Sequence, residues 1–177
     1  MFPKYAWIDS LLSEKECAFV IEKGKELMER ANTANNNPDD YRVGSVGWFL
    51  KGEDTDLDLI LERVIDGFGW TVYEHFYGAK IKGVEPIQFT HYQEGDYFDW
   101  HYDAIEHSER PLRAYSASLE LTNPESYSGG GLEFHTLEQT IPDRALGRLV
   151  VFPSLLLHRA RKVESGERSS LVLWASM

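Results

Sequence analysis

The stretch Gly147–Trp174, GRLVVFPSLLLHRARKVESGERSSLVLW, contains three short segments rich in apolar and β-branched residues, separated by turn-forming residues. Short segments of this kind predict the strands of a β-sandwich or barrel. The pattern continues toward the N-terminus as far as about Val84, in the segments VEPIQFTHY, DYFDWHYD, RAYSASLELT and GGLEFHT. Residues from about 84 to 176 are therefore expected to form a β-structured core.

Two helical segments lie ahead of this core. In SEKECAFVIEKGKELMER, Ser13 and Glu16 have the spacing of a capping box, and apolar residues follow at roughly helical spacing. DTDLDLILERVIDGFGWTVYEHFY predicts a second helix, which Gly67 and Gly69 could break. YRVGSVGWF, between the two, reads as a strand. Helices ahead of seven or eight strands predict an α+β fold with the N-terminal helices packed on one face of a jelly roll.

Length and composition set further limits. A chain of 177 residues can bury a substantial core, and we expect a single domain over 1–177, with helical support at about 10–80 and the β-core at about 84–176. The formal net charge of −11 argues against nucleic acid as a partner. Cys17 is the single cysteine, which excludes an intrachain disulfide and a thiolate metal cluster.

Location and assembly are expectations from what the sequence lacks. The start, MFPKYAWIDS, has no apolar run of signal-peptide length, and LVVFPSLLLH contains a proline and is too short to span a bilayer. We therefore expect a soluble, cytoplasmic protein without a membrane partner. Without a heptad pattern or an obvious exposed apolar stripe, a monomer is the default expectation.

The motif HYD carries the first candidate chemistry. Side chains at positions i and i+2 of a strand point to the same face, so His101 and Asp103 are expected to project together. One imidazole and one carboxylate on one face make half of a site for a divalent ion. An exposed polar strand end is the alternative, since H-x-D also occurs by chance in many proteins.

His158 follows a strongly apolar run, where a neighbouring strand of a jelly roll would carry it inward. A histidine in such a place is often a core residue with one hydrogen bond. With His101 and Asp103, however, it completes a set of two imidazoles and one carboxylate. This set is the facial triad of non-haem Fe(II) oxygenases, which leaves metal positions open for a cosubstrate and O₂. Zn(II) would also bind to such a set.

Arg168 stands ten residues beyond His158, at the start of an apolar strand. A buried guanidinium is costly unless it meets a carboxylate, ideally as a two-pronged pair. Arg168 is therefore either a turn residue that faces solvent or an anchor for a dicarboxylate whose other end chelates the metal. In the second interpretation Ser170, on the same face, adds a hydroxyl donor, and Tyr92, on the strand before the HYD strand, adds a phenol.

From about Gln88 to Trp174 the chain resembles the 2-oxoglutarate- and iron(II)-dependent oxygenases, in the prolyl 4-hydroxylase-like branch. The elements of the resemblance occur in the family's order: a tyrosine strand, H-x-D, a Gly-Gly turn, G-x-L-V-x-F-P, the distal histidine, and G-x-R before a strand with tryptophan. The resemblance implies a double-stranded β-helix, a cupin-like jelly roll, with Fe(II), 2-oxoglutarate and O₂ as cofactor and cosubstrates. It implies these roles: iron ligands His101, Asp103 and His158; distal-carboxylate contacts Arg168 and Tyr92, with Ser170 beside them.

The function that the resemblance implies is hydroxylation of an unactivated C–H bond, with release of succinate and CO₂. A prolyl or other residue in a protein or peptide is the expected substrate, and a free amino acid or small metabolite is the alternative. Two readings from other classes stay open. One is a jelly-roll binding module without catalysis, and the other is a Zn-dependent hydrolase with Asp99 or Glu106 as its base.

For other residues near the motif the sequence leaves more than one role open. Asp99 lies two residues before His101, so it could orient that imidazole or stand on the surface. His107 is expected in a loop, exposed or in contact with substrate, and His135 at a strand end near the surface. Gly129–Gly131 suit a tight turn or a bulge. The Asn-rich loop at residues 32–40 could frame the substrate entrance.

Overall fold

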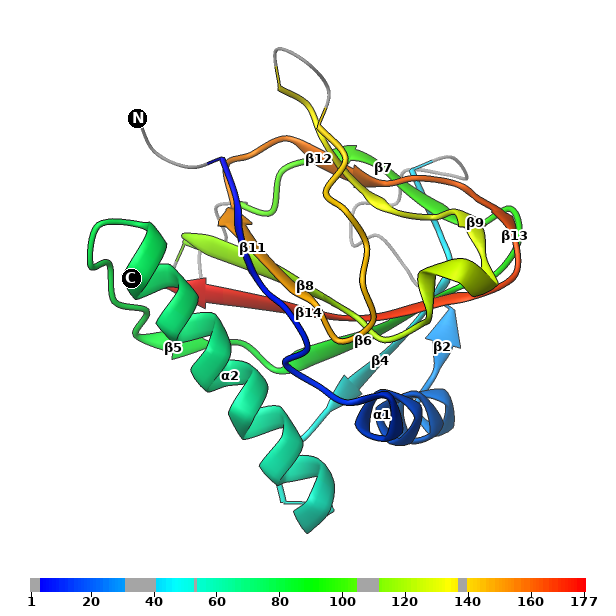
Figure 1. Ribbon diagram of the computed structural model, residues 1–177, viewed down its shortest axis with the longest axis horizontal. Helices are drawn as coiled ribbons and strands as arrows, with labels where there is room; N and C mark the ends of the chain where they lie inside the picture. Colours follow the sequence, from blue (N-terminus) through cyan, green and yellow to red (C-terminus); the bar gives the residue numbers. More distant parts are fainter. Residues whose placement is uncertain (1–3, 31–40, 53, 105–111, 137–139) are drawn as a thin grey trace.

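Two facing β-sheets and two helices make up the fold, seen edge-on as layers in Figure 1. The computed structural model describes residues 4–30, 41–52, 54–104, 112–136 and 140–177. The helices are α1 (Glu14–Glu26) and α2 (Thr55–His75), and a 3₁₀ turn covers Pro124–Ser126. The strands are β1 (Ala6–Ile8), β2 (Glu29–Arg30), β3 (Arg42–Val43), β4 (Ser45–Phe49), β5 (Gly83–Val84), β6 (Ile87–Tyr92), β7 (Tyr97–His101), β8 (Tyr115–Glu120), β9 (Ser128–Gly129), β10 (Leu132–Phe134), β11 (Leu149–Pro153), β12 (His158–Ala160), β13 (Val163–Ser165) and β14 (Arg168–Ser176).

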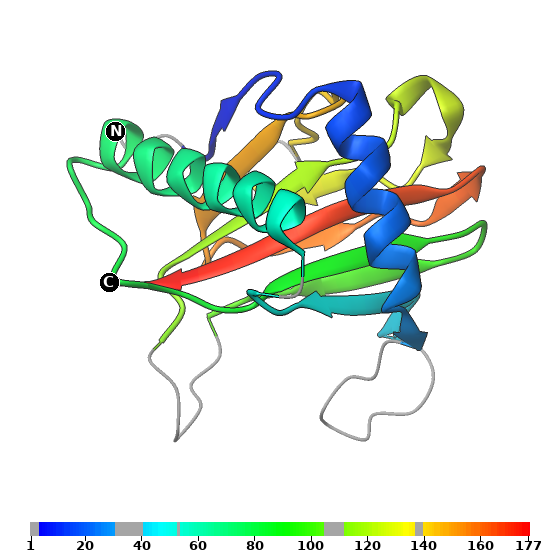
Figure 2. The same ribbon diagram turned by 90° about the horizontal axis from the view of Figure 1, so that it is seen from below.

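The larger sheet has the strand order β1-β11-β8-β14-β6-β4-β2, with β5 paired to β14. The smaller sheet has the order β10-β12-β7-β3, and β13 and β9 form a separate two-stranded ribbon. The strand pairs of both sheets are antiparallel. The helices lie across the outer face of the larger sheet, as the view from below shows (Figure 2). This is the predicted α+β jelly roll with helices on one face, and the prediction is confirmed.

Each strand of the larger sheet has two different faces, and this difference creates both the core and the pocket. On β14, Leu171 and Leu173 are fully buried in the core cluster that includes Phe68 of α2. Ser170 and Val172, which alternate with these leucines along the strand, line a pocket between the two sheets. Burial of each large apolar side chain stabilises the fold by roughly 1.5–3 kcal/mol. The helices therefore cover the apolar face, and the polar face is left for a ligand.

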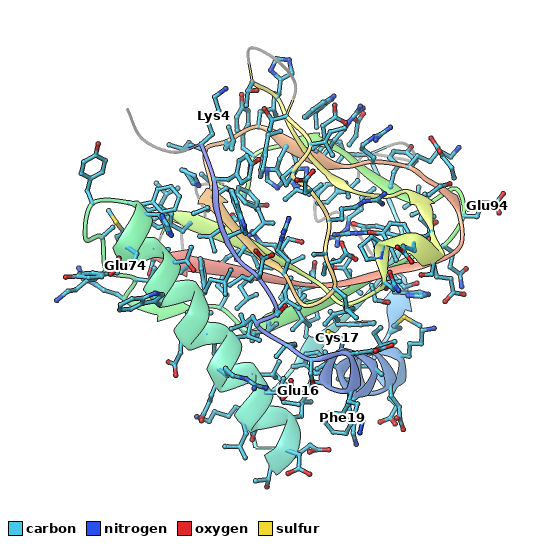
Figure 3. All side chains as sticks on the ribbon, viewed as in Figure 1. Lys4, Glu16, Cys17, Phe19, Glu74 and Glu94 are labelled. Atoms are coloured by element: carbon cyan, nitrogen blue, oxygen red, sulfur yellow. The ribbon has the colours of Figure 1, made fainter. Side chains whose placement is uncertain are left out.

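Helix α1 begins as the sequence predicts. The Ser13 hydroxyl accepts a hydrogen bond from the Glu16 backbone at 3.4 Å, and the Glu16 carboxylate accepts one from the Ser13 backbone at 2.8 Å. Cys17 points from the helix toward the larger sheet and is buried, whereas Phe19 lies on the opposite side of the helix (Figure 3). The capping box therefore fixes where α1 begins, and Cys17 lies on the face of the helix that meets the sheet.

Helix α2 runs without a break from Thr55 to His75, so the break that Gly67 and Gly69 could have caused does not occur. Gly67 instead allows a close approach, because a Cβ there would lie 3.0 Å from the side chain of Leu11. The glycine lets the N-terminal segment pack directly on the helix. Among the helices in the described part of the chain, none combines the length and the apolar character that a membrane crossing needs.

Glu16 also links the two helices, because its carboxylate accepts a hydrogen bond from Arg63 of α2. This bond, with those from Ser13, lowers the pKa of Glu16 from 4.5 to about 2. A lowered carboxyl pKa stabilises the fold above the unfolded pKa, and the contribution is lost as pH falls from about 4.5 toward 2. Glu16→Gln should therefore cost about 1 kcal/mol of unfolding free energy at pH 7, after screening by solvent.

Urea unfolding at a series of pH values measures this effect. The difference between the wild-type protein and Glu16→Gln should shrink as pH falls below about 4.5. Glu14→Gln, in the same helical turn, is the matched control and should stay close to the wild type. A Glu16→Gln difference that is the same at pH 7 and pH 3 would contradict the assigned linkage.

The glycine triplet forms the turn predicted for it. Gly129 and Gly130 have φ angles of +69° and +64°, which residues with a Cβ rarely adopt. A Cβ at Gly129 would lie 2.1 Å from the carbonyl oxygen of Lys162, on the neighbouring strand segment. The β13–β9 pair is irregular here, with a shift in register between Val163 and Ser165.

Candidate metal centre

The smaller sheet brings three predicted residues together at one end of the pocket. His101 ends β7 and is paired directly with His158, the first residue of β12. Asp103 lies two residues beyond the end of β7, and its backbone N–H donates to the carbonyl of Ser154 at 3.0 Å. One potential ligand atom from each of the three side chains lies within 4.8 Å of the other two. Asp103 and His158 are buried, and His101 is 9% exposed.

The ring nitrogens are oriented for a shared cation. His101 Nε2 lies 3.6 Å from one oxygen of Asp103, and His158 Nε2 lies 3.3 Å from the other. Ligand bonds of about 2.1 Å at right angles would place neighbouring ligand atoms about 3 Å apart, close to these distances. The Nδ1 atoms donate to backbone carbonyls, of Asp99 at 2.7 Å and of Leu156 at 2.8 Å. These bonds leave the Nε2 lone pairs free to bind a metal.

The electrostatic setting favours the charge states that a metal needs. Burial, together with the charge of the nearby His158, lowers the pKa of His101 from 6.5 to about 4. Burial alone would raise the pKa of Asp103, but contacts with His158, His101 and the Ser116 hydroxyl outweigh it and keep this pKa well below its ordinary value. At neutral pH the cluster therefore offers a neutral imidazole at His101 and a carboxylate at Asp103, which suit a divalent cation.

Asp99 orients His101 through its backbone rather than through its carboxylate. The β7–β12 register shifts between His158 and Ala160, so that β7 carries one extra residue at this point. The bulge interrupts the alternation expected from the sequence. As a result the Asp99 side chain is exposed and accepts a hydrogen bond from the Trp100 backbone, and Phe98 takes the inward place. The Phe98 ring stacks on that of His101, with centroids 3.6 Å apart.

The pocket runs between the sheets from the metal centre to Arg168. Its apolar walls include Phe98, Leu132, Phe152 and Val172. Arg168 is 4% exposed, so the alternative of a turn residue facing solvent is wrong. Tyr92 is its direct partner across the β6–β14 ladder, and Ser170 accepts from Arg168 Nη1 at 3.4 Å. The three residues expected around a distal carboxylate therefore line the same pocket as the metal centre.

Glu120, which was not predicted from the sequence, already contacts this arginine. Arg168 Nε donates to Glu120 Oε2 at 3.0 Å, and the Glu120 side chain is 8% exposed. Burial would lower the pKa of Arg168, but the charge of Glu120 more than compensates and raises it. The sequence contained a signal for Glu120: a glutamate inside the apolar strand segment SASLELT.

Arg42 is a second cation in the pocket that was not predicted. Its Nη2 donates to Gln88 Oε1 at 2.9 Å, and its guanidinium lies 4.6 Å from the centre of the Phe98 ring. Within the described part of the chain, Arg42 Nε and Trp174 Nε1 are buried donors without a hydrogen-bond partner. Both residues line the pocket. Buried donors in this state indicate room for a ligand with acceptor groups.

Gly44 makes room for Tyr92. A Cβ at position 44 would lie 2.6 Å from the Tyr92 ring, so Gly44→Ala should displace the ring and cost about 1–3 kcal/mol of unfolding free energy. The variant should also bind 2-oxoglutarate more weakly, if Tyr92 contacts that ligand. Thermal unfolding and ligand titration measure the two effects. Gly52→Ala, where the added Cβ meets nothing within 4 Å, controls for stiffening of the backbone, and equal behaviour of the two variants would contradict the expectation.

The remaining predicted residues lie away from the centre. His91, next to Tyr92 on β6, does not line the pocket, and its Nδ1 lies 2.9 Å from the Ser169 hydroxyl. His135 is exposed and packs edge-on against Trp100. Glu106, His107 and the loop at residues 32–40 lie outside the described residues.

Comparison with known proteins identifies the family. The sequence profile of the 2OG-Fe(II) oxygenase superfamily, in which 2OG is 2-oxoglutarate, matches residues 87–176. This chain belongs to that superfamily. Fe(II), 2-oxoglutarate and O₂ are the metal and cosubstrates of the family, and the cluster of His101, Asp103 and His158 has the donor set for the metal.

Curated relatives match about half of the chain. A PKHD-type hydroxylase of Shewanella sp. (strain ANA-3) is 41% identical over 93 residues, which is 50% of this chain and 42% of the relative. A PKHD-type hydroxylase of Teredinibacter turnerae is 35% identical over 97 residues, 51% of this chain and 42% of the relative. The match thus spans less than half the length of these relatives.

Solved structures agree over almost the whole chain. The viral collagen prolyl hydroxylase of Paramecium bursaria Chlorella virus-1, in complex with 2-oxoglutarate, has a TM-score of 0.75 at 21% identity, covering 99% of this chain and 97% of its own. A Pseudomonas putida prolyl-4-hydroxylase has a TM-score of 0.75 at 20% identity, covering 98% and 92%. These similarities confirm the double-stranded β-helix fold.

Proposed function

We propose that this protein is an Fe(II)- and 2-oxoglutarate-dependent dioxygenase that hydroxylates an unactivated C–H bond of a prolyl or other residue in a protein or peptide. The observation that carries the proposal is the convergence of His101, Asp103 and His158 at one end of a pocket with Arg168 at the other. Membership of the 2OG-Fe(II) oxygenase superfamily supports the same chemistry.

Each group of residues has a distinct part. His101, Asp103 and His158 hold Fe(II), while the Asp99 and Leu156 carbonyls fix the two imidazoles. Bound iron and 2-oxoglutarate supply the oxidising chemistry, in which 2-oxoglutarate and O₂ give succinate, CO₂ and a hydroxylated product.

The cosubstrate is positioned by the far end of the pocket. Arg168 binds the distal carboxylate of 2-oxoglutarate with Tyr92 and Ser170 beside it. The apolar walls, including Phe98 and Phe152, keep water from the reacting atoms.

The unpartnered donors of the pocket support the proposed substrate class. Arg42 Nε and Trp174 Nε1 suit a substrate with carbonyl acceptors, as a peptide backbone provides. A prolyl hydroxylase of Trichoplax adhaerens has been solved in complex with a peptide fragment of hypoxia-inducible factor, at 17% identity and with a TM-score of 0.75. A free amino acid is the second candidate, because Arg42 could pair with its carboxylate.

Assembly and location complete the proposal. One domain over 1–177 is supported by the shared core of α1, α2 and the larger sheet. The proposed form is a monomer, and the proposed location is the cytoplasm, where free cysteines such as the buried Cys17 are usual.

A turnover assay tests the proposal. Protein loaded with Fe(II) in air should convert 2-oxoglutarate to succinate faster when a proline-containing peptide is present, and the peptide should gain one oxygen atom by mass spectrometry. Free proline and other amino acids, assayed in parallel, test the second candidate. Succinate formation at background level with every peptide and amino acid, from a protein with bound iron, would contradict a hydroxylase.

A further inference from the structure

Arg168 is neutralised by a carboxylate of its own chain before any cosubstrate arrives. Glu120 lies on β8 and Arg168 on β14, the neighbouring strand, and both side chains are at least nine-tenths buried. An ion pair at this depth is little screened by water, so the charge of Glu120 acts on whatever approaches Arg168. The far end of the pocket is therefore close to electrically neutral.

One hydrogen bond joins Arg168 and Glu120, so both side chains keep hydrogen-bonding atoms for a further partner. Glu120 accepts from Nε alone, through Oε2, and its Oε1 has no hydrogen-bond partner among the described residues. Arg168 has five N–H donors, of which one meets Glu120 and one meets Ser170 at 3.4 Å. A two-pronged pair would have used both carboxylate oxygens. The geometry thus holds Arg168 by Nε and leaves its terminal nitrogens for a second carboxylate.

A second carboxylate at Arg168 would also lie near Glu120. Two arginines line the adjoining pocket beside Glu120, but Arg144 already donates to the Gly129 carbonyl and Arg148 to Asp9. The charge of Arg148 is therefore balanced by Asp9, whereas Arg144 keeps its charge because a backbone carbonyl is neutral. A bound distal carboxylate would share one guanidinium with Glu120, and the repulsion between the two carboxylates would oppose binding.

We propose that Glu120 is a specificity-determining and positioning residue of the cosubstrate site. It fixes the orientation of Arg168 through Nε, and its charge reduces the preference of the site for a 2-oxo dicarboxylate over a 2-oxo monocarboxylate. This role rests on the proposed function, since it assumes that 2-oxoglutarate binds with its far end at Arg168. A purely structural ion pair would affect stability and leave this preference unchanged.

Two ligands separate the effects. 2-Oxoglutarate and 2-oxopentanoate have the same carbon chain and the same chelating end, but only the first has a distal carboxylate. The ratio of their dissociation constants therefore reports on the Arg168 end alone. In the wild-type protein the ratio should be less than about tenfold, because Glu120 offsets much of the attraction of Arg168.

Glu120→Gln is the decisive variant, since glutamine can still accept from Arg168 Nε and lacks the charge. The ratio should rise about tenfold, through tighter 2-oxoglutarate binding and unchanged 2-oxopentanoate binding. Glu133→Gln is the matched control, because Glu133 is a buried glutamate that accepts from Arg159 Nε at 2.8 Å and does not line the pocket. That variant should keep the wild-type ratio.

Isothermal titration calorimetry of the Fe(II)-loaded proteins without O₂ makes the measurement independent of turnover. An unchanged or lower ratio in Glu120→Gln would overturn the role of Glu120, and so would a wild-type ratio above about 100-fold. In both cases the binding of 2-oxoglutarate would still support the proposed function. If Glu120→Gln does not fold, the ratio of the two dissociation constants in the wild-type protein still tests the proposal. Binding of neither ligand to the wild-type protein would overturn the proposed function, and the role of Glu120 with it.

Discussion

Replacement of His158 by alanine should lower Fe(II)-dependent turnover by more than about 100-fold, because loss of groups that merely support a metal ligand already costs 10- to 100-fold. His158 Nε2 lies 3.3 Å from Asp103. Because His158 Nδ1 donates to the Leu156 carbonyl, the lone pair on Nε2 is available to a metal. The variant should also retain less than a full equivalent of iron after desalting. Iron analysis and succinate formation measure the two losses.

His75→Ala is the matched control for this prediction. His75 is the last residue of α2 and is exposed, and it belongs neither to the metal centre nor to the pocket lining. It should keep wild-type iron content and turnover. Iron-dependent succinate formation at the wild-type rate in His158→Ala would show that His158 is no ligand, and the assignment of the metal centre would fail.

Replacement of Arg168 by alanine should raise the dissociation constant of 2-oxoglutarate by about 100-fold, as expected for losing charged hydrogen bonds. Part of this effect comes from Glu120, which would then face the distal carboxylate without its cation. The unpaired buried charge should also destabilise the fold, by about 3–5 kcal/mol. Calorimetric titration and urea unfolding measure these outcomes.

A double variant separates the two causes. Arg168→Ala combined with Glu120→Ala removes both charges, so it should recover much of the lost stability and bind 2-oxoglutarate only about as well as 2-oxopentanoate. If Arg168→Ala leaves the dissociation constant of 2-oxoglutarate unchanged, Arg168 is a structural residue of the Glu120 pair and no cosubstrate anchor.

The parts of the site that the sequence predicted depend on short-range regularities. The H-x-D spacing predicted His101 and Asp103 on one face from the two-residue period of a strand, and the two side chains do converge, although Asp103 lies just beyond the end of β7. His158 follows from the order of the strands in the resembled family. The helix start at Ser13 follows from a four-residue motif that acts locally. Apart from His158, each of these predictions depends on a pattern within one segment.

The parts that were not predicted depend on contacts between distant segments. Glu120 and Arg168 are 48 positions apart, and Arg42 and Gln88 are 46 apart. Their pairing depends on which strands become neighbours and in which register. The bulge in β7 likewise depends on its pairing with β12, and it turned the Asp99 carboxylate outward while the Asp99 carbonyl met His101. A sequence without its strand order does not fix these contacts.

The shape of the fold explains why one pocket collects these groups. In the larger sheet the helix-facing side chains form the apolar core, so the opposite side chains are free to be polar. The smaller sheet supplies the metal centre from above this polar face, as the layers in Figure 1 indicate.

The most direct test of the central claim is anaerobic titration of the Fe(II)-loaded protein with 2-oxoglutarate, followed by visible absorbance. Chelation of iron by the 2-oxo acid gives a weak charge-transfer band. We expect the band to develop and saturate in the wild-type protein and to be absent in His158→Ala. A folded, iron-loaded wild-type protein that develops no band would contradict the assignment of the metal centre and of the cosubstrate pocket.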